Sequence, residues 1–172
     1  MRKDKNSMML LSKYILDVKP YNEYGISDSW GKSSLREFLN GDFYDESFID
    51  DEKRIIFKMP HIIDTYTYED NIYIFDKNEY SGIFKASVIN KENKLIATEG
   101  TPYAKAKGLY VKEAKEMWYD GNSLYWLGNI NKENHFSETV EYNGYMSGYG
   151  VDQRLNLCGV RPVVCLCWED MS

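Results

Sequence analysis

The chain has 172 residues and a formal net charge of −6, from 21 Lys and Arg against 27 Asp and Glu. This length suits one domain with its own core, and the acidic balance argues against general nucleic-acid binding. Hydrophobic residues at 43% and charged residues at 28% exclude disorder, collagen and coiled coil as descriptions of the whole chain. We therefore expect a single globular domain over residues 1–172 that needs no metal or disulfide to fold.

The sequence predicts neither a membrane span nor an export signal. No apolar run approaches the ~20 residues that cross a bilayer. The apolar run after the basic N-terminus is interrupted by Ser12-Lys13-Tyr14 after four residues, whereas a signal peptide needs about 7–15. We expect no membrane partner, and either a cytoplasmic protein or a piece of a longer exported or phage protein.

The first part of the chain is predicted to contain one strand and two helices. Residues 8–16 form an apolar run that predicts a strand, ended by a proline. Ser34-Leu35-Arg36-Glu37 has the form of a capping box and predicts a helix that ends at Gly41 in the left-handed conformation. Acidic residues followed by basic ones favour a second helix over 47–57, ended by Pro60.

The rest of the chain is richer in strand signals. Thr101-Pro102 predicts a helix that runs to Lys107, and Asn143-Gly144 predicts a hairpin. Short β-rich runs predict strands at 72–75, 124–127 and 160–166. Since helices and strands do not alternate, we predict an α+β fold with two or three short helices, a mixed or antiparallel sheet and long polar loops.

Several blocks of the sequence, in this order, resemble one bacterial family. They are Leu10-Leu11-Ser12-Lys13-Tyr14-Ile15-Leu16-Asp17 with Pro20-Tyr21-Asn22, Trp30-x-x-Ser33-Ser34-Leu35-Arg36-x-x-Leu39-Asn40-x-x-Phe43, Thr101-x-Tyr103-Ala104-Lys105-Ala106, Tyr125-Trp126-Leu127 and Gly159-Val160-Arg161-Pro162-Val163-Val164. Together the blocks span nearly the whole chain. The chain resembles domain-of-unknown-function family 6273, which is found in gut bacteria and phages.

This family in turn resembles the C-type-lectin-like fold of formylglycine-generating enzymes and phage variable proteins. The resemblance implies that a terminal Gly-x-Arg strand, here Gly159-Val160-Arg161, pairs beside the N-terminal strand. Family members usually carry a further strand before the Leu-Leu-Ser block, where this chain has only residues 1–7. This difference suggests a shortened N-terminus, and the resulting open strand edge would invite a homo-oligomer.

Arg161 lies between apolar residues, and a buried guanidinium needs a carboxylate or several carbonyls around it. We interpret Arg161 as a structural clamp, with contact to a ligand as the alternative. Its candidate acidic partners are Glu37, Asp51 and Glu52. Arg36 lies on a helix surface by default, whereas the resemblance implies a second clamp there, alongside Trp30 of the same block.

No pattern predicts a metal, a cofactor or a catalytic centre. His61 and His135 lack the clustered ligands that zinc needs, and we expect both on the surface. The chain has three cysteines, Cys158, Cys165 and Cys167. Cys165 and Cys167 lie in an apolar strand, where a thiol behaves as a small hydrophobe. An enzyme with a cysteine centre is kept as an alternative, because Cys and His partners meet only in space.

The segment 129–154 interleaves tyrosines and asparagines with glycines, a composition typical of adaptable binding loops. Its candidate ligand contacts are Tyr142, Asn143, Tyr145 and Tyr149. The alternative is a solvent-covered loop whose tyrosines pack against the body of the protein. We expect a non-enzymatic module that binds a carbohydrate or a protein, with a structural domain that self-associates through a strand edge as the second hypothesis.

Overall fold

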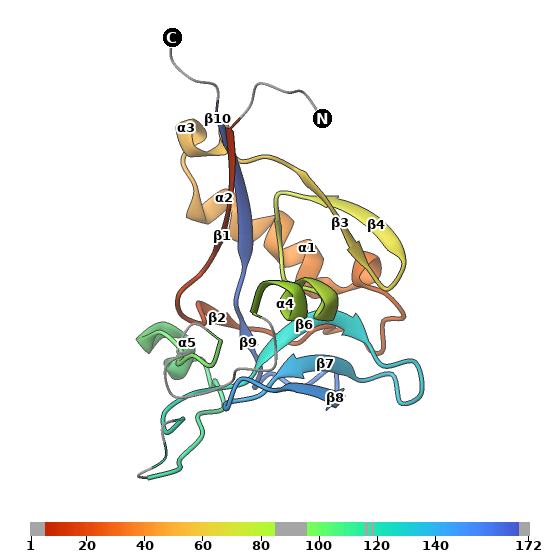
Figure 1. The fold of residues 1–172 in the computed structure, drawn as a ribbon, viewed down its shortest axis with the longest axis vertical. Helices are drawn as coiled ribbons and strands as arrows, with labels where there is room; N and C mark the ends of the chain where they lie inside the picture. Colours follow the sequence, from red (N-terminus) through yellow and green to blue (C-terminus); the bar gives the residue numbers. More distant parts are fainter. Residues whose placement is uncertain (1–5, 85–95, 116, 118, 169–172) are drawn as a thin grey trace.

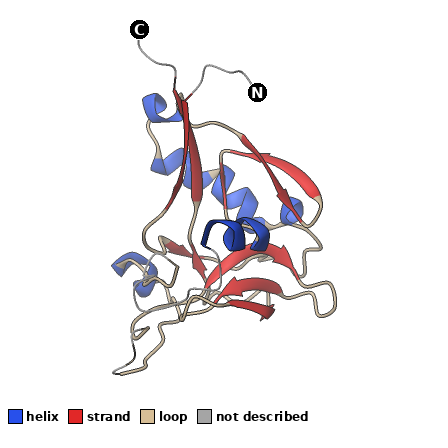
Figure 2. Ribbon diagram, viewed as in Figure 1, coloured by secondary structure: helices blue, strands red, loops and turns tan. Residues whose placement is uncertain are grey.

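The computed structural model describes residues 6–84, 96–115, 117 and 119–168. It has a mixed α+β fold in which short helices lie among three small sheets (Figures 1 and 2). In chain order the elements are β1 (Asn6–Leu11), β2 (Asp17–Val18), the 3-10 helix η1 (Trp30–Lys32), α1 (Ser34–Asn40), α2 (Asp42–Ser47), α3 (Asp50–Lys53), β3 (Met59–Ile63), β4 (Tyr66–Asp70), β5 (Ile72–Tyr73), α4 (Lys77–Phe84), α5 (Pro102–Ala106), β6 (Tyr125–Ile130), β7 (Ser137–Val140), β8 (Met146–Val151), β9 (Gly159–Val160) and β10 (Val163–Trp168).

The N- and C-terminal segments join two of the sheets. The three-stranded sheet has the order β1-β10-β5, the five-stranded sheet has the order β2-β9-β6-β7-β8, and β3 pairs with β4. Leu11 lies opposite Val163 in the first sheet and Asp17 lies opposite Val160 in the second, both in antiparallel pairs. The two segments therefore run side by side from one sheet into the next, which is the pairing expected from the sequence (Figure 1).

Both terminal strands are shorter than predicted, because the chain changes sheets within them. The first strand ends at Leu11 rather than at residue 16, and the last is divided into β9 and β10 at Arg161 and Pro162. The Ser12 amide donates to the Pro162 carbonyl at 3.0 Å where the segments pass from one sheet to the next. The two segments thus stay hydrogen-bonded between the sheets although strand geometry is lost.

Helix α1 forms where it was predicted, but its cap lies one residue earlier. The Ser33 hydroxyl accepts from the Arg36 amide, whereas the Ser34 hydroxyl accepts from the Glu23 amide in a preceding loop. Gly41 is not left-handed, since its φ is −111° and α2 begins at the next residue. The predicted capping box and the left-handed conformation of Gly41 are therefore wrong, while the end of the helix at Gly41 and its buried apolar face are as predicted.

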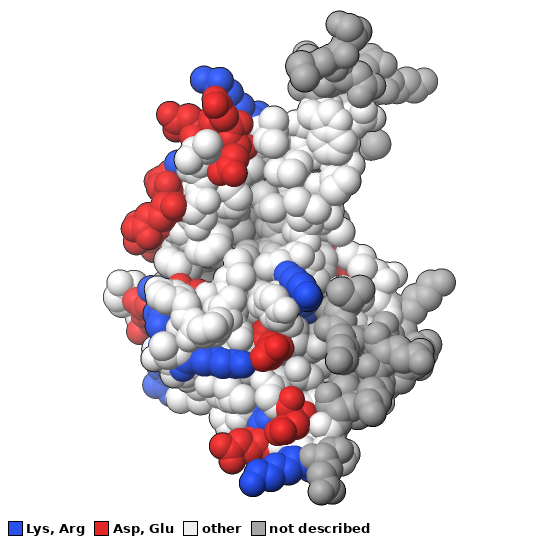
Figure 3. All heavy atoms as spheres, turned by 90° about the vertical axis from the view of Figure 1, so that its left-hand side faces the viewer, with Lys and Arg blue, Asp and Glu red and all other residues white. Residues whose placement is uncertain are grey.

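The helix predicted over 47–57 forms, but only as the shorter α3, with the predicted acidic residues in its first turn and Lys53 in its last. Phe48 and Ile49 adopt extended conformations and separate two short helices, α2 and α3. Acidic residues occupy the first turn of each, where the helix dipole favours them, and acidic side chains gather over these helices in Figure 3. The described part of the chain contains five α-helices rather than two or three.

The hairpin β3–β4 was not predicted, because Pro60 was interpreted as the end of a helix. Pro60 instead lies in β3, opposite Glu69. A two-stranded ribbon tolerates a missing amide, since each of its strands is an edge. In the turn, Asp64 and Thr65 have φ of 48° and 78°, and in short turns these conformations are usually adopted by Asn or Gly.

Aromatic side chains link η1 and the loop before it to the five-stranded sheet. Tyr21 lies between Trp30 and Trp126, with ring centroids 6.0 and 5.9 Å away, and all three side chains are buried. The Tyr21 hydroxyl donates to Gly128 in β6, and the Trp126 indole donates to the Lys19 carbonyl. Large aromatics with satisfied polar tips contribute strongly to a core of this size.

Candidate functional site

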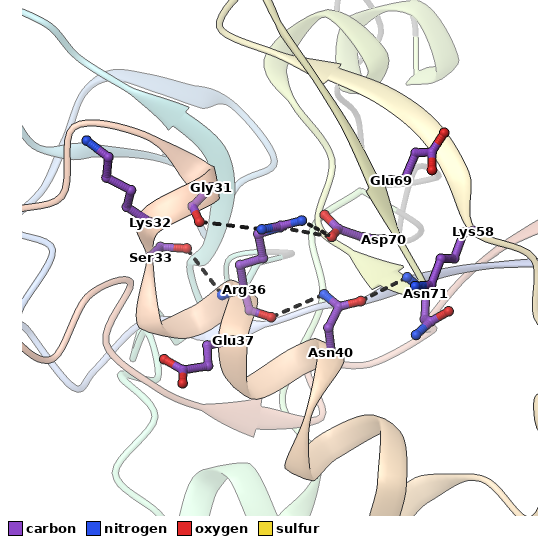
Figure 4. Close-up of a pocket in the computed structure, with 10 residues that line it drawn as sticks. All are labelled: Gly31, Lys32, Ser33, Arg36, Glu37, Asn40, Lys58, Glu69, Asp70 and Asn71. Carbon is purple, nitrogen blue, oxygen red and sulfur yellow. Dashed lines mark hydrogen bonds and ion pairs between the residues drawn. The ribbon is translucent and has the colours of Figure 1, made fainter.

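The carboxylate of Asp70 joins three elements beside a polar cavity of about 470 Å³ (Figure 4). Asp70 ends β4 and is 3% exposed. Its Oδ1 accepts from Arg36 Nε at 2.9 Å and lies 2.7 Å from Nη2, while its Oδ2 accepts from Trp30 Nε1 at 2.9 Å. Arg36 and Trp30 therefore attach α1 and η1 to the β3–β4 hairpin.

His61 belongs to the same cluster, and the prediction that it lies on the surface is wrong. Its ring is buried and stacks on Tyr73 with centroids 4.2 Å apart. Nδ1 lies 3.1 Å from the Met59 carbonyl, and Nε2 lies 3.3 Å from Asp70 Oδ2 without the alignment of a hydrogen bond. No local motif could have revealed this position, because the ring is covered by residues distant in sequence.

The cluster keeps Asp70 ionised. Burial alone would raise the pKa of its carboxyl, but the contacts with His61, Arg36 and Trp30 outweigh burial and hold the pKa below its usual value. Glu79, in contrast, has its pKa raised, chiefly by burial. Asp70 is thus a permanent anion at neutral pH, and three side chains from other elements converge on it.

The cavity beside Asp70 is lined largely by groups that the fold already uses. The Asn40 amide group accepts from the Asn71 and Ile72 amides and donates to the Ile72 carbonyl. In Figure 4 Arg36 points toward Asp70, whereas Glu37 points away from it. We assign this cavity a structural role, since its most buried polar atoms have protein partners.

Arg161 is 2% exposed and its guanidinium is surrounded by oxygen atoms. Nε donates to the Ser12 carbonyl at 3.0 Å, and Nη1 donates to the Ile96 carbonyl and the Tyr125 hydroxyl, each at 3.1 Å. The expectation of an acidic partner fails for all three candidates, Glu37, Asp51 and Glu52, none of which contacts Arg161. Several carbonyls, the other kind of partner expected from the sequence, are present around it.

Two of the three cysteines are poorly placed for catalysis. All three are free thiols, and Cys158 and Cys165 are buried. Burial raises the pKa of Cys158 well above its usual value and that of Cys165 to about 11. Because the thiolate is the nucleophile, these two cysteines are poorly suited to covalent catalysis at neutral pH.

The candidate ligand-contact residues lie along the hairpin formed by β7 and β8, and β8 is an edge strand. Tyr142 and Asn143 are in the turn, Tyr145 directly precedes β8, and Tyr149 lies within it. Tyr142 packs against Tyr119 with centroids 5.2 Å apart, which matches the alternative of a ring packed on the body. Tyr145 is 55% exposed and Tyr149 is 73% exposed, so these two rings remain available to a partner.

Side chains from outside the hairpin hold its carbonyl oxygens. The Tyr80 hydroxyl donates to the Gly144 carbonyl at 2.6 Å, and the Asn122 side chain donates to the Tyr142 carbonyl at 3.2 Å. The side chains of Asn131 and Asn134 donate to the carbonyls of Gly148 at 2.8 Å and Tyr149 at 2.9 Å. Of these donors, only Asn131 and Asn134 belong to the asparagine-rich segment 129–154, and its composition alone did not reveal their role. The backbone is fixed while two rings stay exposed.

Neither a metal centre nor a membrane-spanning helix is found in the described residues. They contain no group of three or more His, Cys, Asp or Glu side chains arranged to hold a metal ion. Over the same residues, no helix has the length and apolar character required to cross a bilayer.

Comparison with known proteins identifies a family. Neither the curated proteins nor the solved structures yield a match to this chain. A family model described as a domain of unknown function (DUF6273) matches residues 5–168, nearly the whole chain. The chain therefore belongs to the DUF6273 family.

Proposed function

We propose that this protein is a non-enzymatic module that binds a partner protein through the β7–β8 hairpin. The observation that carries the proposal is the combination of two exposed rings, Tyr145 and Tyr149, with a backbone held by outside side chains. Tyrosine provides a large contact area at low entropic cost. A braced backbone loses little further freedom on binding, which favours affinity.

The position of the rings favours a macromolecular partner. Both stand on or beside an edge strand, and both expose more than half of their surface. Tyr149 also rests against Phe136, with ring centroids 5.9 Å apart, which limits its motion. Exposed aromatic anchors of this kind typically carry much of the energy of a protein interface.

A cysteine-based enzyme is disfavoured by the state of the thiols. The raised pKa values of Cys158 and Cys165 leave almost no thiolate at neutral pH. In the native protein, both thiols should resist a thiol reagent until the chain is unfolded. Rapid labelling of either one would contradict the non-enzymatic assignment.

The experiment is selection of a random peptide display library on the immobilised protein. Peptides that bind the wild type should lose at least tenfold in affinity for the double variant Tyr145→Ser/Tyr149→Ser, because both anchors are removed. Tyr24→Ser is the matched control, since Tyr24 is 84% exposed but lies outside the hairpin. Peptides that bind the double variant as well as the wild type would refute the proposal.

We also infer that the finer fold is C-type-lectin-like. The antiparallel pairing of β1 with β10 and the helices that follow the opening strands support this inference. The long polar connections before β9 support it as well. An experimental structure that superimposes on lectin-like domains over both terminal strands would agree with it, whereas a different strand order would not.

Self-association through β1 is a second candidate function. Among the described strands β1 pairs only with β10 and so lies at the edge of its sheet. The strand contains no charge and no proline, and Met8, Met9 and Leu10 are 51%, 39% and 39% exposed. Soluble proteins usually protect such an edge with lysine, proline or a bulge.

Light scattering over a range of protein concentrations tests this second candidate. If β1 mediates assembly, the wild type should form dimers or larger species, and Met9→Lys should return it to the monomer. Ile26→Lys is the control, because Ile26 is 61% exposed at a site away from the edge. A wild type that stays monomeric at all concentrations would eliminate this function.

A further inference from the structure

A second polar cavity, of about 500 Å³, lies among the tip of the β3–β4 hairpin, the start of α4, the end of β6, the following loop and β7. Its volume lies within the range of small-ligand sites. The lining residues that carry the argument are Asp64, Lys77, Asn78, Asn129, Lys132 and Glu138. The four candidate ligand-contact residues of the β7–β8 hairpin do not line this cavity, so it is a separate site.

The walls of the cavity are fixed by hydrogen bonds between elements. Asn129 is 1% exposed; its Nδ2 donates to Asp64 at 2.9 Å, and its Oδ1 accepts from the Lys77 amide at 2.6 Å. The Ile130 amide donates to the second oxygen of Asp64 at 3.1 Å. One buried amide side chain thus ties the β3–β4 turn and the start of α4 to β6, so the cavity is formed in advance of any ligand.

The turn that delivers Asp64 is strained. Asp64 and Thr65 both have positive φ, and a β-branched residue rarely adopts this conformation. Strain of this kind tends to be retained where it positions a functional group. Here it holds the Asp64 carboxylate at the wall of the cavity.

Glu138 keeps one oxygen atom for a ligand. Its side chain is 10% exposed, and Oε1 accepts from Lys77 Nζ at 3.1 Å. Within the described residues Oε2 has no hydrogen-bond partner, although the side chain lines the cavity. A largely buried carboxylate whose second oxygen lacks a protein partner requires a donor from water or from a ligand.

The remaining lining offers both donors and acceptors. Lys132 Nζ and Asn78 Oδ1 make no hydrogen bond within the described part of the chain, and both residues line the cavity. Four carboxylates against two lysines disfavour phosphates and other anions, and only Ile62 and Ile130 offer an apolar surface. No metal-binding group occurs among the described residues.

We propose that this cavity binds a neutral saccharide. Each sugar hydroxyl both donates and accepts a hydrogen bond, so adjacent hydroxyls can satisfy Glu138 Oε2 and Lys132 Nζ together. The excess of carboxylates excludes acidic sugars by repulsion. The ligand binds without a metal ion, directly to amide, ammonium and carboxylate groups.

The test is a titration of the ¹⁵N-labelled full chain, followed by its amide NMR signals, with glucose, galactose, N-acetylglucosamine and their β-linked disaccharides. At least one of these sugars should shift the signals of Lys77, Ile130 and Glu138. Glucuronate should bind at least tenfold more weakly than that sugar. Absence of shifts at these residues for the whole panel would overturn the proposal.

Variants of the lining residues locate the sugar in this cavity. Glu138→Gln keeps the shape of the side chain and should weaken binding at least tenfold, and Lys132→Ala, in an exposed loop, should weaken it without affecting folding. Glu37→Gln, beside the cavity next to Asp70, is the matched control. Tyr145→Ser/Tyr149→Ser should leave the affinity for sugar unchanged, because these residues lie outside the cavity. The saccharide proposal and the hairpin proposal can therefore fail independently. Unchanged sugar affinity in both Glu138→Gln and Lys132→Ala would refute the saccharide site.

Discussion

Asp70 is an example of a single side chain that organises distant parts of the chain. Its two oxygens accept hydrogen bonds from Arg36 in α1 and Trp30 in η1, and the His61 ring in β3 lies against one of them. Removing one partner from a buried charged cluster is costly, because the remaining charges lose their compensation. The cluster therefore contributes to stability through its completeness rather than through any single contact.

Asp70→Asn should destabilise the protein by about 3 kcal/mol at neutral pH, because an amide group cannot accept from all of these donors. The lowered pKa of Asp70 means that its contribution is present above its unfolded value of 3.8 and is lost as the pH falls through the lower folded value. The difference in the free energy of unfolding between wild type and variant should therefore become smaller as the pH is lowered. Urea unfolding at pH 7 and at pH 3 measures it, and Asp51→Asn, in an exposed ion pair, is the control.

The contribution of Arg161 to stability depends on the shape of its guanidinium as much as on its charge. Arg161→Lys keeps the charge but cannot reach the Ser12 carbonyl, the Ile96 carbonyl and the Tyr125 hydroxyl at once. We expect a loss of about 2–3 kcal/mol in the free energy of unfolding, since buried acceptors are left unpaired. Arg154→Lys, at an exposed ion pair, should change stability by less than about 0.5 kcal/mol; equal effects in urea unfolding would contradict the assigned role.

At the scale of elements, the sequence predicted what is determined locally. Helix α5 forms with Thr101 as its cap, as predicted from Thr101-Pro102. Helix α4 was missed although Asp76 and Glu79 form a reciprocal capping box, in which each carboxylate accepts from the other residue's amide. That signal, Asp-x-x-Glu, was present in the sequence and could have predicted the start of the helix.

Features that depend on tertiary packing could not be predicted. The turn at Asp64 and Thr65 has no glycine or asparagine to announce it, because its strained conformation is maintained by contacts with Asn129 and Ile130. The burial of His61 likewise depends on other elements. In the candidate binding segment, composition identified the tyrosines, but only the structure separated the packed Tyr142 from the two exposed rings.

The β7–β8 hairpin allows a matched test with two glycines. Gly150 has φ of 76°, and an added Cβ would lie 2.6 Å from the Ser137 carbonyl oxygen, whereas Gly148 has open space around it. Gly150→Ala should therefore cost about 1–3 kcal/mol, and Gly148→Ala should have little effect. Thermal unfolding of both variants measures this difference; equal melting temperatures would mean that the backbone at Gly150 is not held in this conformation.

At the scale of the whole molecule, the first and last described strands are hydrogen-bonded neighbours. Ser7 lies opposite Cys167 in the β1–β10 pair. Opposed residues of antiparallel strands have Cα separations that a disulfide can bridge. One substitution can therefore test whether the two ends are paired in solution.

Ser7→Cys should form a disulfide with Cys167 under mild oxidation. The bond closes a very long loop, so it should raise the free energy of unfolding by up to about 5 kcal/mol relative to the reduced form. Thiol titration of the denatured, unreduced protein and urea unfolding with and without reductant are the measurements. The same substitution combined with Cys167→Ser is the control, and a variant that keeps all of its thiols after oxidation would argue against the strand register.

The β1–β10 pairing also has a consequence for biosynthesis. Strand β1 is translated long before its partner strand, which spans residues 163–168. At about 5–20 residues per second, that interval is roughly 8–30 s. Throughout it, β1 lacks the strand that pairs with it in the folded protein, so its apolar side chains can attract chaperones near the exit tunnel.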